Sequence, residues 1–323
     1  MRLKAIWYAA VLAASSLAAQ ADPSFWKFEW PDTDFEKTTI ENWVEIMSGG
    51  PPKDGIPALD EVSWIAVADE TRIAPAEAVI TLEVDGEQPR AYPIRYLMWH
   101  EIVNDEVGGV PVAVTYCPLC NSGLTFDRRV DGKVLSFGVS GKLRNSDMVM
   151  YDRETESWWQ QAIGTGIVGE LTGVELTQLP TWMESWEEFS TRNPNGIVMN
   201  QPPWPRRYGQ NPYVNYDSST KPFLYNGEMP PHDIPALMRV VRVGDVAWTF
   251  ERLREEGTIS EEGVVLSWAS GQASALDNFR VSDGKDVGTV RVRDEAGNDL
   301  PHDVMFAFAF HAFFPDGTWK VGG

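Results

Sequence analysis

The sequence predicts an α+β fold that is mainly β, built as a single large domain of short strands and hairpins with a few short helices. Three observations support this prediction. Short apolar segments rich in β-branched residues recur along the chain, Asp-Gly pairs mark hairpin turns at 85–86 and 131–132, and no repeat or linker divides the sequence. Alternating strand and helix units are too few for a doubly wound parallel sheet.

The expected elements follow from the spacing of apolar residues. Strands are expected at 78–84, 110–116, 124–126, 134–139, 147–151, 240–246, 264–268, 287–292 and 304–314. Helices are expected at 35–47, 93–102 and 181–190, the second of them with Pro93 at its first position. Residues 193–235 are rich in Pro, Asn, Gly and Tyr, and they predict a long ordered loop because aromatic residues interrupt it.

Composition excludes several classes of protein. The 323 residues include 47 acidic and 27 basic side chains, so the net charge of −20 disfavours binding to nucleic acid or to anionic membranes. Aromatic residues make up 11% of the chain, which excludes a disordered protein. Only 2 cysteines are present, which excludes a disulfide-stapled scaffold.

The first 21 residues have the layout of a secretory signal peptide. Arg2 and Lys4 give a basic start, an apolar run follows, and Ala19 and Ala21 supply the small residues of a cleavage site. A membrane anchor is the alternative, but the apolar run of about 15 residues is short for a span of ~20. We therefore expect a periplasmic or secreted protein cleaved after Ala21, with an N-terminal arm at 22–49, a domain at 50–323 and no membrane span in the mature chain.

The two cysteines, Cys117 and Cys120, lie three positions apart after a strand of buried type. A structural disulfide between them would close a loop of about four residues, which contributes only ~2 kcal/mol. A redox dithiol is the second interpretation, because a Cys-x-x-Cys pair holds two thiols within exchange distance. A metal site is the third, since two thiolates on one turn suit Cu(I) or Zn²⁺.

Four histidines are available as further ligands. His100 is the candidate ligand, because a short helix ending near it and the strand that leads to Cys117 can bring the imidazole back to the cysteines. A hydrogen-bonded core histidine is the alternative. His311 has apolar neighbours that favour burial, and His232 and His302 are expected at the surface because both occur as Pro-His-Asp in loops.

The segment after the cysteines is locally basic within an acidic chain. Four of its side chains are candidates for binding an anion or for stabilising a thiolate from outside the ligand set: Arg128, Lys142, Arg144 and Arg153. Surface charges paired with neighbouring acids are the alternative interpretation.

Several ordered motifs resemble a known bacterial family. HEIVND at 100–105, VTYCPLC at 114–120, MVMYDR at 148–153 and FHAFFP at 310–315 look like the signature of domain of unknown function 3179. GPPKDGIPALD at 50–60, NYD at 215–217 and SALD at 274–277 are also similar to it. The resemblance covers roughly residues 50 to 316 and implies one continuous domain, often in an exported protein, but it implies no activity.

Together these features predict an exported protein with a Cys-x-x-Cys and His site that binds a soft metal and keeps an open coordination position. Copper as Cu(I) is the expected ion and zinc the less favoured one, with Cys117, Cys120 and His100 as ligands. A thiol–disulfide redox enzyme using the same cysteines is one alternative, and a non-catalytic interaction protein with a structural disulfide is another. A small molecule or a periplasmic protein is the expected partner, and whether the protein is an enzyme stays open.

Overall fold

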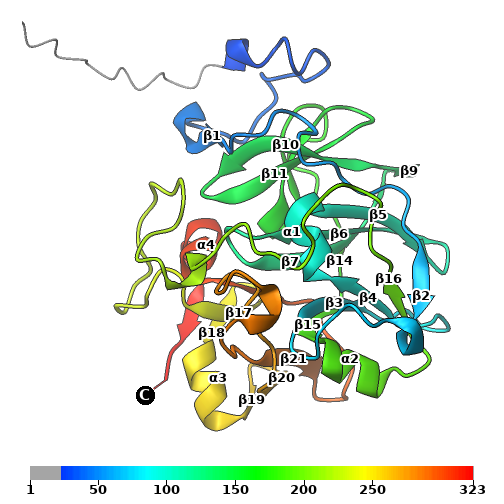
Figure 1. The fold of residues 1–323 in the computed structure, drawn as a ribbon. Coiled ribbons are helices and arrows are strands. Elements are labelled where there is room, and N and C mark those ends of the chain that lie inside the picture. The colour runs from blue at the N-terminus through cyan, green and yellow to red at the C-terminus, as the bar shows by residue number, and fades with distance from the viewer. Residues whose placement is uncertain (1–22, 323) are drawn as a thin grey trace, which may run out of the picture.

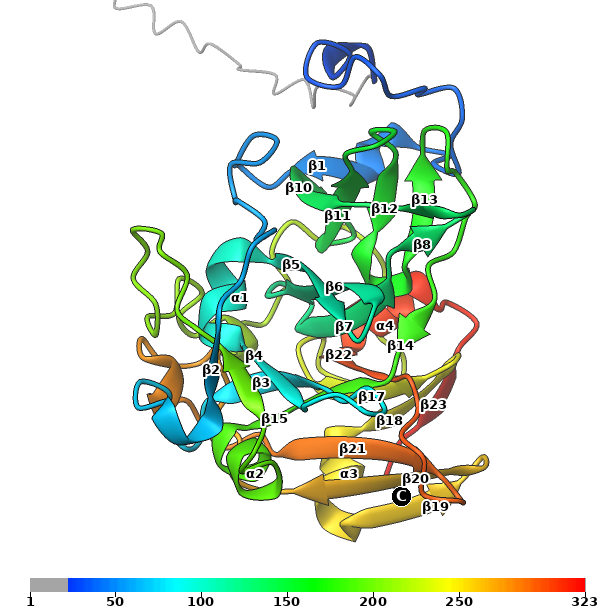
Figure 2. The ribbon, with the colours of Figure 1, turned by 90° about the vertical axis from the view of Figure 1, so that its right-hand side faces the viewer.

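The computed structural model describes residues 23–322, and the predicted signal peptide lies outside these residues. The fold is mainly β, with 37% of residues in strands and 15% in helices, and its small sheets form a single domain. The predicted fold class is therefore confirmed. In Figure 2 the sheets lie above one another, from β10–β13 at the top, through β5–β7, to β19–β21 at the bottom.

The first sheet carries the N-terminal arm on its edge. Its strands are all antiparallel and run in the order β1 (Ile46–Ser48), β10 (Phe137–Arg144), β11 (Asp147–Asp152), β12 (Trp158–Gln160) and β13 (Thr165–Val168). A register shift in β10 lies beside Gly141, which has a φ of 73°. A Cβ at this position would lie 2.1 Å from the Pro51 carbonyl oxygen, so only glycine fits. Glycine at this bulge therefore lets the loop that contains Pro51 lie directly against the sheet.

The second sheet leads to the cysteines. It has the order β14 (Gln178–Leu179), β7 (Ser122–Asp127), β6 (Val110–Cys117) and β5 (Ile102–Val107), again antiparallel. Its inner strands are almost entirely buried, as the apolar run at 110–116 predicts. A two-stranded ribbon of β8 (Arg129–Val130) and β9 (Lys133–Val134) extends from it.

Three further sheets complete the domain. The third has the order β15 (Thr181–Ser185), β3 (Ala78–Leu82), β4 (Arg90–Pro93), β16 (Ile197–Met199) and β2 (Trp64–Ala66). The fourth has the order β22 (Asp303–Phe306), β17 (Arg239–Val243), β18 (Val246–Thr249) and β23 (Thr318–Lys320). The fifth has the order β19 (Thr258–Glu261), β20 (Val264–Ala269) and β21 (Thr289–Asp294). The β4–β16 and β18–β23 pairs are parallel.

The helices are short and join strands rather than forming a layer (Figure 1). Each α-helix has seven residues: α1 (Ile94–His100), α2 (Trp186–Arg192), α3 (Phe250–Glu256) and α4 (Ala307–Phe313). Single 3₁₀ turns lie at η1 (Pro23–Phe25), η2 (Trp43–Glu45), η3 (Val67–Asp69), η4 (Gln161–Ile163), η5 (Tyr216–Ser218) and η6 (Val281–Asp283). No helix of residues 23–322 is long and apolar enough to cross a membrane.

Several of the expected elements are wrong in part. The strand expected at 240–246 contains the turn between β17 and β18, because Val243 pairs with Val246. The helix expected at 181–190 begins only at Trp186, because residues 181–185 form a strand that pairs with β3. The Ser185 hydroxyl then caps α2 by accepting a hydrogen bond from the Glu188 amide at 3.2 Å. The strand expected at 304–314 ends at Phe306 and continues as α4, since a fully apolar run suits a buried strand or a buried helix equally. The helix expected at 35–47 is an extended arm with one 3₁₀ turn.

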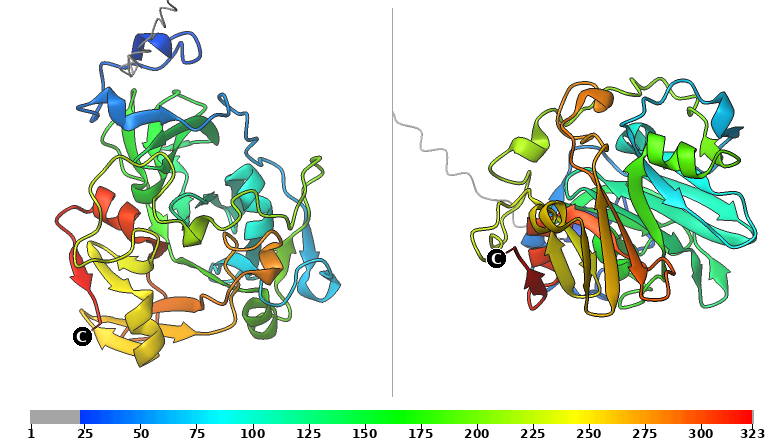
Figure 3. Two further views of the ribbon diagram at one scale, coloured as in Figure 1. Left: turned by 60° about the vertical axis from the view of Figure 1, so that its left-hand side comes forward. Right: turned by 90° about the horizontal axis from the view of Figure 1, so that it is seen from below.

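The arm is held by aromatic packing instead of helical periodicity. Trp30 and Phe35 pack edge-on against Trp158 of β12, with ring centroids 5.3 and 5.4 Å apart. These residues form a hydrophobic cluster with the outer face of the first sheet, separate from the main core. Figure 3 places the arm and the C-terminus at opposite ends of the molecule.

Candidate metal centre

The two cysteines lie at the hairpin between β6 and β7, Cys117 at the end of β6 and Cys120 in the turn. Cys117 is the last residue of β6 and pairs with Ser122, the first residue of β7, so the turn spans 118–121. Asn121 closes it with a φ of 54°, a left-handed conformation that asparagine tolerates better than most residues. Both thiols are free and fully buried. The strand predicted before the cysteines is therefore confirmed, and their disulfide is not formed in this structure.

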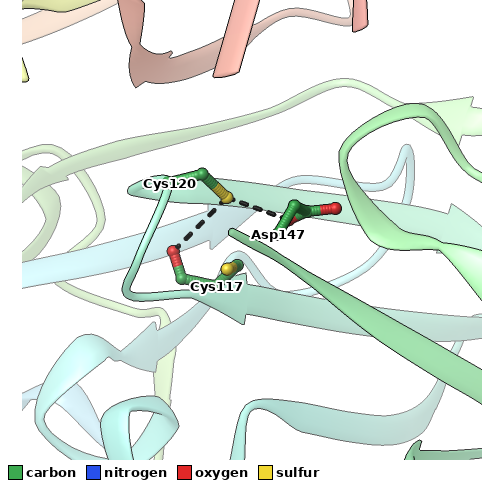
Figure 4. Close-up of side chains that lie close together, drawn as sticks. All are labelled: Cys117, Cys120 and Asp147. Carbon is green, nitrogen blue, oxygen red and sulfur yellow. Dashed lines mark hydrogen bonds between the residues drawn. The ribbon is translucent and has the colours of Figure 1, made fainter. Parts of the chain in front are cut away.

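Asp147 faces the cysteines from a second hairpin. Asn145 and Ser146 both have positive φ and form the two-residue turn between β10 and β11, in which Arg144 pairs with Asp147. Asp147 follows this turn directly, and its side chain lies in the interior, where it is 0% exposed. The Cys120 thiol donates a hydrogen bond to Oδ1 of Asp147 at 2.9 Å (Figure 4).

The second oxygen of Asp147 is held by two neutral donors. Oδ2 accepts hydrogen bonds from Nε2 of Gln160 at 2.6 Å and from the Ala162 amide at 2.9 Å. Both donors come from the end of β12 and from η4. Because these bonds fix the plane of the carboxylate, Oδ1 stays directed at Cys120.

The two sulfurs and the Asp147 carboxylate form a compact set of possible metal ligands. One ligand atom from each of Cys117, Cys120 and Asp147 lies within 4.8 Å of the others. This is the one group of three or more His, Cys, Asp and Glu side chains with such proximity in residues 23–322. The arrangement can chelate a single ion if the three groups move toward it by small rotations.

Four hydrogen bonds from distant segments fix the cysteine turn. The Phe306 amide donates to the Cys120 carbonyl at 2.8 Å, and Nδ2 of Asn121 donates to the Val304 carbonyl at 3.1 Å. The Ser122 hydroxyl donates to Asp303 at 2.6 Å, and the Tyr216 hydroxyl donates to the Leu119 carbonyl at 2.9 Å. The turn is therefore positioned by β22 and by the loop around η5 before any ligand arrives.

The structure places His100 outside this group. Nδ1 of His100 lies 2.7 Å from the Pro57 carbonyl oxygen, and Nε2 lies 2.6 Å from the Tyr208 hydroxyl. Both ring nitrogens are thus already engaged away from the sulfurs, as in the alternative interpretation of a hydrogen-bonded histidine. The reason is local: α1 ends at His100, and the next residue, Glu101, has a φ of 60° and reverses the chain into β5.

The basic residues predicted to lie near the cysteines are engaged elsewhere. Arg128 donates to the Leu135 carbonyl at 2.6 Å, and Lys142 and Arg144 pair with Glu29 and Glu45 of the arm. Arg153 pairs with Asp60. In the part of the chain that the structure describes, no arginine or lysine hydrogen-bonds to Cys117, Cys120 or Asp147. Most of these charges therefore hold the arm and the first loop of the domain.

The other histidines also lie outside the group. His232 is exposed, as predicted. His302 is buried rather than exposed, because it precedes β22 and its Nδ1 lies 2.8 Å from the Leu300 carbonyl oxygen. His311 is partly buried in α4, with Nε2 at 4.0 Å from Glu228.

The electrostatics of the site are those of buried acids without a counter-charge. Burial raises the pKa of the Cys117 thiol, and the nearby carboxyls of Asp147 and Glu101 add to the effect. The pKa of Cys120 is raised well above its ordinary value, again mainly by burial. Burial also raises the pKa of Asp147. Negative charge on these groups is therefore costly until a cation is present.

Sequence reasoning missed Asp147 and Glu101. Asp147 stands 27 residues after Cys120 on another sheet, so no spacing motif joins them. The pattern at 145–147, a turn-forming pair followed by an acid at the start of an apolar strand, is the signal that was available. Glu101 occurs in the sequence analysis only as the second residue of the HEIVND motif.

Comparison with known proteins gives a family and no activity. Residues 53–317 match the model of a family described as a protein of unknown function, DUF3179. No curated protein and no solved structure matches the chain.

Proposed function

Because the chain belongs to the DUF3179 family, whose description assigns no activity, we propose a function from the buried site itself. The protein binds one soft or borderline transition-metal ion through Cys117, Cys120 and Asp147. The observation that carries the proposal is the convergence of two thiols and one carboxylate within 4.8 Å at the junction of two sheets. These are ligand types that such ions prefer.

The charge balance favours a cation over a reactive thiol. A redox cysteine is activated by positive charge or by a helix N-terminus, which lowers its pKa. Here burial and acidic neighbours raise the pKa of both thiols, and neither thiol is exposed to a protein substrate. A bound cation reverses this situation, because it stabilises the thiolates and the carboxylate together. The thiol–disulfide enzyme is therefore the second candidate.

The identity of the ion follows from the third donor. Two thiolates suit Cu(I), the ion expected from the sequence, and they also suit Zn²⁺. A carboxylate oxygen in place of an imidazole is a harder donor and shifts the balance toward Zn²⁺. A divalent ion also neutralises more of the negative charge that three ionised ligands bring into the interior. Both ions accordingly belong in the test, with copper and zinc titrated separately.

The experiment is a metal titration of the reduced mature protein. We expect one equivalent of Zn²⁺ or Cu(I) to bind, and we expect Cys117→Ser and Cys120→Ser to abolish stoichiometric binding. His232→Ala is the control, because this exposed histidine lies outside the group. Full occupancy in both serine variants would refute the site. Failure of the wild-type protein to bind either ion, together with reversible disulfide formation in a glutathione buffer, would favour the redox alternative.

Export is part of the same proposal, on the strength of the N-terminal sequence pattern. A periplasmic or secreted location would expose the thiols to oxidants, and a bound metal would protect them. N-terminal sequencing of the protein from its native host should begin at Asp22. An intact Met1 in the membrane fraction would instead indicate an anchor.

A further inference from the structure

We propose that Glu101 is the fourth ligand of this site and closes its coordination shell through its carboxylate. The inference rests on the proposed metal site and deepens it, since three protein ligands leave a tetrahedral ion one position short. It is carried by the conformation, burial and missing partners of this one side chain.

The backbone of Glu101 adopts a conformation that disfavours a long side chain. Glu101 follows α1 directly, with a φ of 60° and a ψ of −33°, where helices ordinarily end on glycine or asparagine. Its amide donates to the Leu97 carbonyl at 2.7 Å, and its carbonyl accepts from the Tyr116 amide at 2.8 Å. Backbone hydrogen bonds therefore hold Glu101 between α1 and the strand that ends at Cys117. Glycine could make the same hydrogen bonds with less strain.

The side chain of Glu101 is buried without a partner. It is 8% exposed, and no hydrogen bond or ion pair within residues 23–322 reaches its carboxylate. Its electrostatic neighbours include Asp147, the Cys117 thiol and Tyr213, and burial followed by the Asp147 charge raises the pKa of Glu101 to about 8. A largely buried carboxyl without a protein donor is unfavourable for folding, so neither the backbone conformation nor the burial of Glu101 benefits the fold.

A bound metal ion would give the buried Glu101 carboxylate a partner. In the arrangement described here the Glu101 carboxylate stands outside the set of atoms that lie within 4.8 Å of one another. Coordination therefore requires the side chain to rotate toward the sulfurs, a movement that breaks no hydrogen bond of its carboxyl. Local strain of this kind is concentrated at functional sites, where the binding energy of a ligand compensates for it.

The test uses Co²⁺ as a spectroscopic probe of the zinc site. Thiolate-to-cobalt charge-transfer absorption reports the cysteines, and the intensity of the ligand-field bands reports four-coordinate geometry. We expect the wild-type protein to show both. Glu101→Gln should retain the charge-transfer absorption, change the ligand-field bands and weaken metal binding about 10-fold or more. Glu77→Gln, at another buried glutamate beside Arg95, is the matched control and should change neither signal.

A second variant of Glu101 distinguishes a role in metal binding from a role in folding. Glu101→Gly removes the strain and the buried carboxyl, so the metal-free protein should melt at the same or a higher temperature while its metal affinity falls. A residue retained for folding would give the opposite, a lower melting temperature with unchanged affinity. Unchanged affinity and ligand-field bands in Glu101→Gln would overturn the assignment of Glu101. Absence of the charge-transfer absorption in the wild type would instead overturn the metal site itself.

Discussion

The sulfur of Cys120 lies 2.9 Å from Oδ1 of Asp147, although the two residues belong to different sheets. Cys120 stands in the β6–β7 turn, and Asp147 opens β11 after the β10–β11 turn. Two hairpin ends thus meet in the interior, one bringing two thiols and the other a carboxylate. This contact joins the second sheet to the first and defines the site.

Replacing Asp147 by asparagine should separate metal binding from folding. The amide keeps the size of the side chain and an oxygen that can accept from Gln160 and Ala162, and it removes a buried carboxyl that has no counter-charge. We expect Zn²⁺ affinity to fall at least ~10-fold, while the free energy of unfolding of the metal-free protein is unchanged or higher. Competitive titration and urea denaturation measure the two effects. Unchanged affinity would remove Asp147 from the ligand set.

His100→Ala should affect stability and leave metal binding intact. The imidazole joins α1 to Pro57 and to Tyr208, and its loss leaves polar groups without partners. We expect the free energy of unfolding to fall by about 1–3 kcal/mol. Tyr208→Phe should give a smaller loss in the same direction. A ten-fold drop in metal affinity in His100→Ala, without a matching drop in Tyr208→Phe, would reinstate His100 as a ligand.

Protonation of Asp217 should lower the stability of the protein in acid. It is 8% exposed in the loop around η5, and it pairs with Arg239 and Lys285 and accepts from the Ser274 hydroxyl at 2.6 Å. Burial opposes ionisation, but Arg239, Ser274 and Lys285 outweigh it and lower the pKa of Asp217. A lowered pKa stabilises the folded state above the unfolded value of about 3.9, and this contribution is lost as pH falls through the folded value.

Asp217→Asn measures that contribution. At neutral pH the variant should lose about 3 kcal/mol, because it leaves the buried Arg239 without its charge partner. The difference from wild type should shrink as the pH is lowered below about 4. Urea denaturation at several pH values checks both points. A difference that stays constant across this range would show that the charge of Asp217 does not matter.

The two thiols should react slowly in the native protein. Cys117 and Cys120 are 1% and 0% exposed, so an aqueous thiol reagent must wait for local opening. Both should react at once in denaturant, giving two thiols per chain. Fewer than two thiols in the denatured, unreduced protein would indicate a disulfide. Rapid reaction of one thiol in the native state would contradict the burial described here.

The sequence predicted the parts of the fold that depend on local pattern. The strand that leads to Cys117 is strongly apolar, and the segment at 93–102 contains α1, which begins directly after Pro93. The elements it missed depend on tertiary contacts. Residues 181–185 became a strand because β3 offers a partner, and the arm at 35–47 is extended because Trp158 and its neighbours receive its aromatic rings.

The site was only half predictable for the same reason. Cys117 and Cys120 are neighbours along the chain, so their proximity follows from one turn. Asp147 reaches them only through the packing of two sheets, and no spacing along the chain encodes that packing. Glu101 has a positive φ at the end of α1 and turns the chain into β5 directly after His100, whose ring nitrogens contact Pro57 and Tyr208 instead of the sulfurs. Such a reversal depends on a single backbone angle.

X-ray absorption of the zinc- or copper-loaded protein tests most directly whether two thiolates and a carboxylate oxygen bind one metal ion. We expect two sulfur neighbours at about 2.3 Å, with the remaining neighbours being oxygen, and no imidazole scattering. Loss of both sulfur neighbours in the Cys117→Ser, Cys120→Ser double variant should follow. A spectrum of nitrogen and oxygen neighbours alone in the wild-type protein would rule out the thiolate site.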